Sequence, residues 1–572
     1  MNYRINDNGS TAQADLLRRR IAERIDAKES PDGMEIVLSI DALVPLESYR
    51  IDKTASGWKI TAGDGTGLYH GVGKFLHSAV WTCDSFTPKE TDGVVIPECP
   101  FRCIYFSVHF HNWYYEAPMA DIERYLEDMV MYGFNTMHVI VPVPQIKSLE
   151  DDVFQNAAAR TRAIFMAAKR AGMKVMFGID PNQGLATAPH EFDADQHTLG
   201  RYRGKLGRNL CPNKPGCLEY LRGIWIKCLE QYEDIGLDYV MVWPYDEGGC
   251  SCEQCAPWGA NGFEKLARLV HKDAKRMYPN VKLIYSTWAF DTDPVSEHEY
   301  ETLYKRLGDG EMDYVTYLMT DAHGDYPKFV LDHPVVKPVV NFPEISMWGL
   351  GPWGGFGANP LPKRFERIWN SAKAVLSGGD PYSEGIFEDI SKIQFAGYYW
   401  KKDARYQDVL GEYAAYEFGE AARFDAVKIM ENIEKNHVIA AEASAFFRDH
   451  PGHEDEYTKP TELDMEAAKE ARRLAEELDA KLPPKQRASW RWRILYIRAI
   501  LDEKRYSEFL KREMKFTYPE LYILRHDAPD AQLLSDDPEA QELYKELRRI
   551  FRTLDHDNGM NKWTLPVVQG QN

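Results

Sequence analysis

The chain has 572 residues, which is too long for one hydrophobic core and indicates two to four domains. Its formal net charge of -19 leaves no basic field for phosphate groups, so we expect neither nucleic acid nor an anionic membrane as a partner. The first twenty residues lack the apolar core of a secretory signal, and no run of eighteen apolar residues predicts a membrane span. Nine cysteines argue against a complete disulfide framework. We therefore expect a cytoplasmic protein, with a secreted form whose signal has been removed left open.

Residues 1–98 have the pattern of a small α+β domain. We predict a helix over 15–29, a strand over 34–40, a hairpin formed by 49–51 and 58–62, and a second helix over 67–76. This segment carries no obvious chemistry of its own.

Residues 99–402 predict a (β/α)8 TIM barrel, because eight short strands alternate with helical stretches. The expected strands cover 102–108, 136–141, 174–179, 237–243, 281–287, 314–318, 337–342 and a last one near 383–386. Amphipathic helices between them include 121–132 and 262–278.

Residues 403–572 predict a helical domain, since Ala, Glu, Lys and Arg become frequent and glycine scarce. Helical periodicity covers 465–482 and 489–516. We expect these helices to pack against the barrel or against a second subunit, which leaves a homo-oligomer open.

The tetrapeptide Asp246-Glu247-Gly248-Gly249 follows the fourth predicted strand. Neighbouring residues on a straight strand point to opposite faces, so both carboxylates address one ligand only where the strand has ended or bulged. The two glycines permit that bend. Because barrel active sites lie where strands end, we predict that Asp246 and Glu247 are catalytic.

Carboxylates and aromatic residues recur at the other predicted strand ends. Sugar rings present C–H faces to aromatic rings and hydroxyl groups to carboxylates, so this set predicts a glycoside or oligosaccharide ligand. Helix capping would explain any one of these residues, but it explains the whole set poorly. The candidate substrate-binding residues are His109, His111, Asp180, Trp243, Tyr245, Trp288, Asp291, Tyr317, Asp321, Glu344, Trp348, Trp353, Tyr382 and Glu384.

Glycoside cleavage needs an acid for the leaving oxygen and a second negative group that supports the oxocarbenium-like transition state. We assign the acid to Glu247, with its pKa raised by apolar neighbours such as Trp243 and by Asp246. Asp246 would then orient a substrate N-acetyl group that acts as the internal nucleophile, or assist the transition state directly.

Three further segments carry a family resemblance. Residues 47–51 (ESYRI), 58–62 (WKITA) and 67–71 (GLYHG) resemble the small α+β domain that precedes the barrel in family 20 β-N-acetylhexosaminidases and in several α-glucuronidase-like relatives. The Asp246-Glu247 pair resembles that family's catalytic Asp-Glu, in which Asp supports the acetamido group and Glu is the acid. Trp288, Tyr317, Asp321 and Glu384 correspond to strand ends where that family binds the sugar. The resemblance covers about residues 1–400 and implies an exo-acting glycoside hydrolase that retains configuration by substrate assistance.

The first predicted strand departs from that family. Its members start this strand with Arg-Gly and grip the sugar hydroxyls with a later Asp and Arg, whereas here residues 101–103 (FRC) lead to His109 and His111. The sugar, its anomer and its linkage therefore stay open.

The same residues are compatible with two other functions. Glu344, after the seventh strand, would be the nucleophile of an ordinary retaining glycosidase in which Glu247 is the acid/base and no acetamido group is needed. A barrel of this composition would alternatively bind glycans without cleaving them.

The cysteines raise a separate question. We expect no cofactor and no catalytic metal. Cys250, Cys252 and Cys255 nevertheless form a C-x-C-x2-C pattern that suits a structural zinc ion, with Cys211 or Cys217 as the source of a fourth sulfur.

Overall fold

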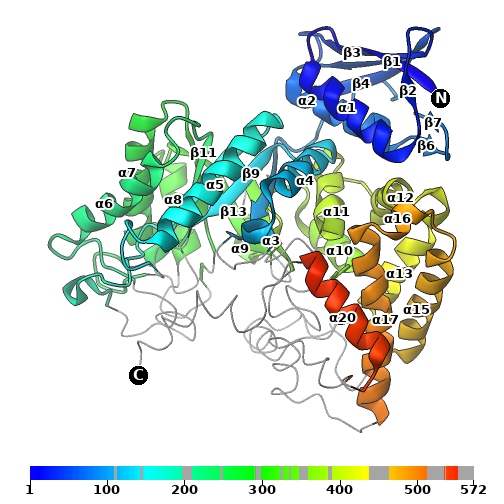
Figure 1. The fold of residues 1–572 in the computed structure, drawn as a ribbon. Coiled ribbons are helices and arrows are strands. Elements are labelled where there is room, and N and C mark those ends of the chain that lie inside the picture. Colours follow the sequence, from blue (N-terminus) through cyan, green and yellow to red (C-terminus); the bar gives the residue numbers. More distant parts are fainter. Residues whose placement is uncertain are drawn as a thin grey trace.

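The computed structural model of the chain describes residues 1–108, 113–141, 146–195, 209–244, 249–288, 290–291, 298–322, 326–333, 337–346, 358–383, 389–436, 463–511, 534 and 536–551. Figure 1 presents three groups of elements: an N-terminal sheet with its helices, a central ring of strands and helices, and a set of C-terminal helices at one side. In the described parts of the chain, no helix combines the length and the apolar character needed to cross a bilayer.

The N-terminal group is a five-stranded sheet in the order β2-β1-β3-β5-β4, in which only the β4–β5 pair is antiparallel. The predicted hairpin is thus confirmed as β4 and β5, and the predicted strand over 34–40 is β3. The elements of this group are β1 (Asn2–Asn6), α1 (Thr11–Arg24), β2 (Lys28–Glu29), β3 (Met34–Ile40), β4 (Tyr49–Lys53), β5 (Gly57–Ala62), α2 (Gly65–His77), β6 (Val80–Trp81) and β7 (Phe86–Thr87).

The first helix differs from the prediction by several residues. Helix α1 begins at Thr11 and ends at Arg24, whereas residues 28–29 form strand β2 beside β1. Helix α1 therefore ends earlier than predicted, because residues 28–29 pair with β1. Helix α2 begins where Asp64 accepts a hydrogen bond from the Gly67 backbone N–H at 2.7 Å, a side-chain cap typical of helix starts.

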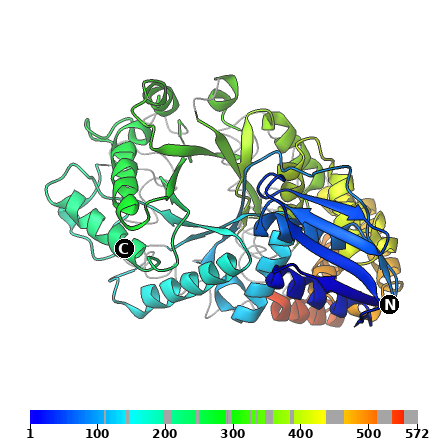
Figure 2. The same ribbon diagram turned by 90° about the horizontal axis from the view of Figure 1, so that it is seen from above.

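The central group is a closed parallel barrel, because β13 pairs both with β12 and with β14. Figure 2 shows these strands as a ring with helices outside it. The predicted (β/α)8 fold is therefore confirmed. The strands are β8 (Phe101–Phe106), β9 (Thr136–Ile140), β10 (Lys174–Ile179), β11 (Tyr239–Val242), β12 (Lys282–Ser286), β13 (Val315–Ala322), β14 (Val339–Ser346), β15 (Leu376–Gly379) and β16 (Tyr382–Ser383).

The eighth position of the barrel is shared by two short strands. We predicted one strand near 383–386, but β15 begins at Leu376 and pairs with β8, and β16 continues along β14. Gly378 has a φ of +120°, and a Cβ atom there would lie 1.6 Å from the Phe101 carbonyl oxygen. The close approach to β8 thus requires glycine, which is why this strand lacks the β-branched residues that make strands recognisable.

Helices join successive strands around the barrel. Helix α4 buries Ile122, Tyr125, Leu126 and Met129, the helical spacing that predicted it. The helices of this group are α3 (Trp113–Glu116), α4 (Met119–Met131), α5 (Asp152–Arg170), α6 (Cys217–Glu230), α7 (Gly262–Met277), α8 (Glu299–Gly308), α9 (Lys328–Asp332), α10 (Pro362–Ala372) and α11 (Asp389–Trp400), with short 3-10 turns at His190–Phe192 and Trp258–Ala260.

The C-terminal group is helical in its described parts, and Figure 1 shows α13, α15 and α17 gathered beside the barrel with α20 along α17. Its members are α12 (Tyr406–Glu417), a 3-10 turn (Glu420–Ala422), α13 (Asp425–Glu434), α15 (Met465–Asp479), α16 (Pro484–Arg487), α17 (Trp490–Lys511) and α20 (Pro538–Phe551). Of the helix predicted over 489–516, residues 490–511 are α17 and the rest lies outside the described residues.

The N-terminal group contacts the barrel at the end where the strands begin. The Glu47 carboxylate accepts hydrogen bonds from Arg102 at 2.8 Å, Asn135 at 2.7 Å and Lys174 at 2.6 Å, and these residues lie at the starts of β8, β9 and β10. The opposite end of the barrel, where the strands finish, is therefore not covered by this group.

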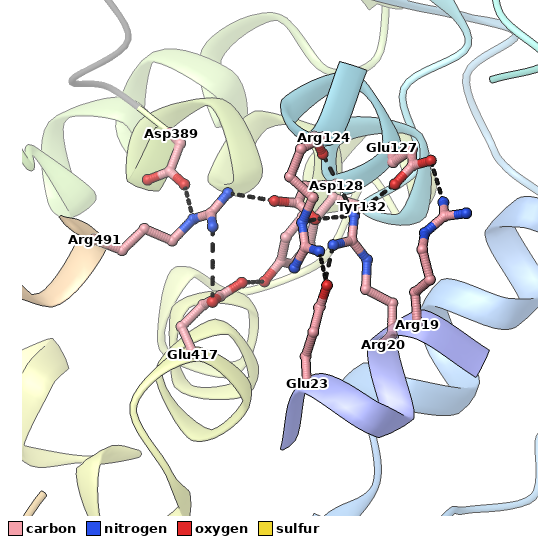
Figure 3. Close-up of polar contacts among 10 residues, drawn as sticks. All are labelled: Arg19, Arg20, Glu23, Arg124, Glu127, Asp128, Tyr132, Asp389, Glu417 and Arg491. Carbon is pink, nitrogen blue, oxygen red and sulfur yellow. Dashed lines mark hydrogen bonds and ion pairs between the residues drawn. The ribbon is translucent and has the colours of Figure 1, made fainter. Parts of the chain in front are cut away.

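A buried ion network joins the three groups (Figure 3). Arg491 of α17 contacts Asp389 at 2.5 Å and Asp128 at 3.0 Å, and its third carboxylate neighbour is Glu417 at 3.9 Å. Arg20 of α1 reaches the same Asp128 at 2.8 Å. One carboxylate of α4 thus links the N-terminal helix α1 with the C-terminal helix α17.

Candidate active site

The alternation of side chains along the barrel strands determines which residues face the barrel interior. Residues two apart on a strand share a face, and the interior of the barrel is lined by Met176, Met241, Ile284, Met319 and Phe342. The same spacing carries the inward face forward to the last residues of each strand. The inward positions where the strands end are therefore Asp180, Trp243, Trp288, Asp321 and Glu344.

Aromatic rings form a continuous wall on this face. The ring centroids of Trp243 and Trp288 are 4.9 Å apart, and Trp243 lies at the same distance from Phe342. Phe342 in turn lies 5.2 Å from Tyr382, which stacks on Tyr105 at 5.4 Å. Trp288 and Tyr382 remain partly exposed, so the wall offers ring surface to a ligand.

Carboxylates lie beside this wall. Glu344 of β14 pairs in register with Tyr382 of β16, and its exposed fraction is 3%. Asp180, directly after β10, is 9% exposed, whereas Asp321 near the end of β13 is half-buried. Acidic groups withdrawn from water beside aromatic rings can bind polyhydroxylated rings and can serve proton transfer or charge stabilisation.

Eight of the predicted site residues lie outside the described residues. The predicted catalytic pair Asp246 and Glu247 lies outside the described residues, as do His109, His111, Tyr245, Trp348, Trp353 and Glu384. The chain on either side of the pair is described. Trp243 precedes it in the barrel interior, and Gly249 follows it against the Trp258 ring, where an added Cβ would lie 2.0 Å from a ring atom.

Two predicted site residues lie elsewhere. Tyr317 packs near Phe101 and Tyr239, the first residues of β8 and β11, so it lies toward the end of the barrel where strands begin. The strand was expected to end at residue 318, but β13 continues to Ala322. Asp291 is exposed, and its carboxylate accepts hydrogen bonds from the backbone N–H groups of Glu299 at 2.7 Å and Tyr300 at 3.2 Å. It therefore caps the start of α8.

One buried pair was not anticipated. His138 of β9 points into the barrel, and its Nδ1 lies 2.7 Å from an Asp380 carboxylate oxygen, with both side chains fully buried. Tyr105 packs on the imidazole at 4.8 Å. Burial and the neighbouring Asp380 also raise the pKa of the Cys103 thiol. This polar layer lies beneath the aromatic wall and contacts its Tyr105.

Metal-binding geometry occurs in the connections that follow β10 and β11. Among the described residues, Cys211, Cys250, Cys252 and Cys255 form the group whose ligand atoms are close enough to share an ion. Cys211 thus supplies the fourth sulfur, and Cys217 at the start of α6 lies outside the group.

Comparisons with known proteins identify the fold. No family model matches the chain, and no curated protein matches it. A GH138 enzyme targeting the pectin rhamnogalacturonan II is similar, with a TM-score of 0.55 and 14% identity over 96% of this chain and 74% of that chain. A GH89 enzyme from Clostridium perfringens, solved with its substrate GlcNAc-α-1,4-galactose, has a TM-score of 0.59 and 11% identity over 92% of this chain. This chain covers 65% of that enzyme, slightly less than two thirds of its length.

A family 20 β-N-acetylglucosaminidase is also similar, at a TM-score of 0.48 and 12% identity over 72% of this chain and 92% of that chain. This likeness is too low to place the chain in family 20. Taken with the strand pairing, the two higher-scoring neighbours support a (β/α)8 barrel with additional elements before and after it.

Proposed function

We propose that the chain is an exo-acting glycoside hydrolase whose active site is the aromatic and acidic mouth of the barrel. The observation that carries the proposal is the contact series Trp288, Trp243, Phe342 and Tyr382 beside Glu344. Such a surface suits a sugar ring, because the C–H faces pack on the aromatic rings while the hydroxyls bind carboxylates. The GH138 and GH89 names of the two similar structures agree with a glycan substrate.

In this proposal Glu247 is the general acid. It follows β11 by five residues, and Trp243 of the aromatic wall stands between them in the chain. Asp246 would hold a substrate acetamido group that attacks the anomeric carbon, as in β-N-acetylhexosaminidases. The substrate would then be an N-acetylated terminal sugar, which is also the sugar named in the GH89 complex.

A second mechanism is favoured by the position of Glu344. This carboxylate is buried on the inward face of the seventh strand position, beside Tyr382 and three positions around the ring from β11. A carboxylate there could attack the anomeric carbon itself, with Glu247 as acid and then base. The enzyme would then retain configuration without needing an acetamido group.

The test compares hydrolysis of aryl glycosides by the wild type and by Glu247→Gln, Asp246→Asn and Glu344→Gln. The panel contains β-GlcNAc, β-GalNAc and α-GlcNAc beside β-Glc, β-Gal and α-glucuronide. We expect Glu247→Gln to lower kcat by about 10² or more, and most strongly for poor leaving groups, since these depend on protonation. Glu301→Gln, which removes an exposed carboxylate of α8, is the matched control.

The substitutions separate the two mechanisms. Loss of activity in Asp246→Asn that is confined to N-acetyl sugars supports substrate assistance. Turnover of sugars without an acetamido group that is abolished by Glu344→Gln supports the two-carboxylate mechanism. If the wild type binds glycans but cleaves none of the panel, and Glu247→Gln leaves that binding unchanged, the enzymatic proposal fails.

A further inference from the structure

Four cysteines from the connections after β10 and β11 converge on one point. The Sγ atoms of Cys211, Cys250, Cys252 and Cys255 all lie within 4.8 Å of one another. Cys211 Sγ is 3.9 Å from the Sγ atoms of both Cys252 and Cys255. A tetrahedron of sulfurs around an ion with bonds of about 2.3 Å has edges of about 3.8 Å, so these separations fit a shared metal. They are too long for disulfides, whose sulfurs lie about 2.05 Å apart.

The sulfurs come from two separate segments that the fold brings together. Cys211 lies between β10 and α6, and its backbone N–H donates to the Phe192 carbonyl at 2.9 Å. The other three follow β11 in a tight turn, in which the Cys255 N–H donates to the Cys252 carbonyl at 2.8 Å. Three of the four side chains are buried, and Cys252 is half-buried.

Polar groups around the sulfurs suit thiolates. The backbone N–H groups of Asp195 and Cys252 point at Cys250 Sγ, at 3.4 Å and 3.5 Å. The Asn213 amide donates to Cys255 Sγ at 3.1 Å, while its oxygen accepts from Lys265 at 2.6 Å. Such outer contacts orient metal ligands and offset their negative charge.

We propose that Cys211, Cys250, Cys252 and Cys255 bind one zinc ion as a structural site. Four protein ligands leave no open position for water or substrate, which distinguishes a structural zinc site from a catalytic one. Thiolate sulfur in tetrahedral geometry selects zinc over magnesium or calcium. The assignment stands on these contacts alone and does not depend on the proposed glycosidase activity.

The zinc ion would link the two connections that follow neighbouring barrel strands. The segment that holds Cys211 also contains Asn209, whose side-chain oxygen accepts hydrogen bonds from Asn182 and Gln183, just after Asp180. On the other side, Cys250 follows Glu247 by three residues in the chain. Zinc would therefore tie the connection after β11 to the connection after β10, and so limit the movement of both at the barrel mouth.

The first test is metal content of the full-length protein, expressed with zinc available and purified without chelators. We expect about one zinc per chain. Titration of the wild type with p-hydroxymercuribenzoate, followed by a zinc indicator, should release the ion as four thiols react. Replacement of zinc by Co²⁺ should give thiolate charge-transfer bands and the visible absorption of a tetrahedral site. Neither readout depends on enzymatic activity.

Variants test the assignment of ligands. Cys255→Ser and Cys211→Ser should lose most of the bound zinc and lower the unfolding temperature by roughly 5 °C or more, since metal binding stabilises only the folded state. Cys217→Ser, which removes a buried thiol outside the cluster, should keep its zinc. The wild-type titration remains informative where a ligand variant fails to fold.

Other outcomes would overturn the proposal. Wild-type protein without zinc whose mass reports two disulfides among these cysteines would show that the sulfurs are oxidised instead. One iron per chain with the colour of a ferric thiolate centre would overturn the choice of zinc. Retention of zinc by both Cys211→Ser and Cys255→Ser would mean that the ion binds elsewhere.

Discussion

The indole of Trp288 is the side chain whose contribution to the proposed site can be measured most directly. It lies 4.9 Å from Trp243, is partly exposed and is on the inward face after β12. If a sugar packs on this wall, Trp288→Ala removes ring contact with the ligand and lowers kcat/KM by about tenfold, with most of the change in KM. The measurement is steady-state hydrolysis of whichever aryl glycoside the wild type cleaves.

Trp81→Ala provides the control for this experiment. Trp81 is also a partly exposed indole that packs on a neighbouring aromatic ring, but it belongs to β6 in the N-terminal group. It should leave kcat/KM unchanged. Equal kinetic losses in the two variants would mean that Trp288 acts through stability and not through contact with the sugar.

The positions of candidate site residues in the barrel were predictable where the end of the preceding strand was predicted correctly. Trp243 and Asp180 belong to this class, because β10 and β11 end close to where the pattern predicted. Tyr317 was misplaced because β13 continues four residues beyond the predicted end. The pair of His138 with Asp380 was missed since the two residues are 242 positions apart, and no local pattern links them. The catalytic roles of Asp246 and Glu247 stay predictions.

At the scale of elements, Arg491 holds helix α17 against α4, α11 and α12. Burial alone would lower its pKa, but Glu417, Asp389 and Asp128 raise it well above the usual value, so this side chain stays charged. Arg491→Met would remove the guanidinium partner of Asp389 and Glu417, while Asp128 would keep its contacts with Arg20 and Arg124 (Figure 3). We expect a loss of about 3 to 5 kcal/mol in the free energy of unfolding, measured by urea denaturation.

Arg473→Met on α15 is the matched control. Arg473 is half-exposed and pairs with Glu470 and Glu477 on the same helix, so its removal should cost at most about 1 kcal/mol. Arg491→Lys should recover only part of the stability, because an ammonium group cannot reproduce the fixed directions of the guanidinium donors. Similar losses for Arg491→Met and Arg473→Met would contradict a role for Arg491 in holding the helices together.

Helices and strands were predicted correctly where the hydrophobic pattern was clear. Strand β3 and helix α15 begin where their periodicity begins, and Asp464 caps α15 through the Ala467 N–H at 2.9 Å. Strand β15 was missed because two of its four residues are glycine, which carries no strand signal. The approach of β8 requires glycine at Gly378, and the Asn341 side chain of β14 requires it at Gly379. Where tertiary contact dictates the residue type, the local pattern contains little information.

At the scale of the whole molecule, the local sequence pattern could not predict how the N-terminal group attaches to the barrel. Glu47 lies two residues before β4, yet its ion partners Arg102 and Lys174 are 55 and 127 residues away. The two ends of the barrel therefore have different roles. The N-terminal group covers the end where strands begin, and the proposed chemistry belongs to the end where they finish.

This attachment predicts a specific response to acid. Burial would raise the pKa of Glu47, but Arg102 and Lys174 outweigh it and lower the pKa to about 2. A carboxylate with a depressed pKa contributes stability above its unfolded value of about 4.5, and this contribution is lost as pH falls from there through about 2. We expect Glu47→Gln to cost about 3 kcal/mol near pH 7, and the difference from wild type to narrow steadily between about pH 5 and pH 3.

The measurement is the free energy of unfolding in urea at each pH for both proteins. His70 also destabilises the fold in acid, because burial lowers its pKa to about 4, and the Glu47 charge acts against that shift. Glu47→Gln therefore lowers the pKa of His70 further in the variant, which opposes part of the narrowing of the difference. Glu412→Gln removes a half-exposed carboxylate that pairs with Lys74, and it should cost at most about 1 kcal/mol near pH 7. A Glu47→Gln difference that stays constant down to about pH 3 would mean that the Glu47 charge does not hold the N-terminal group to the barrel.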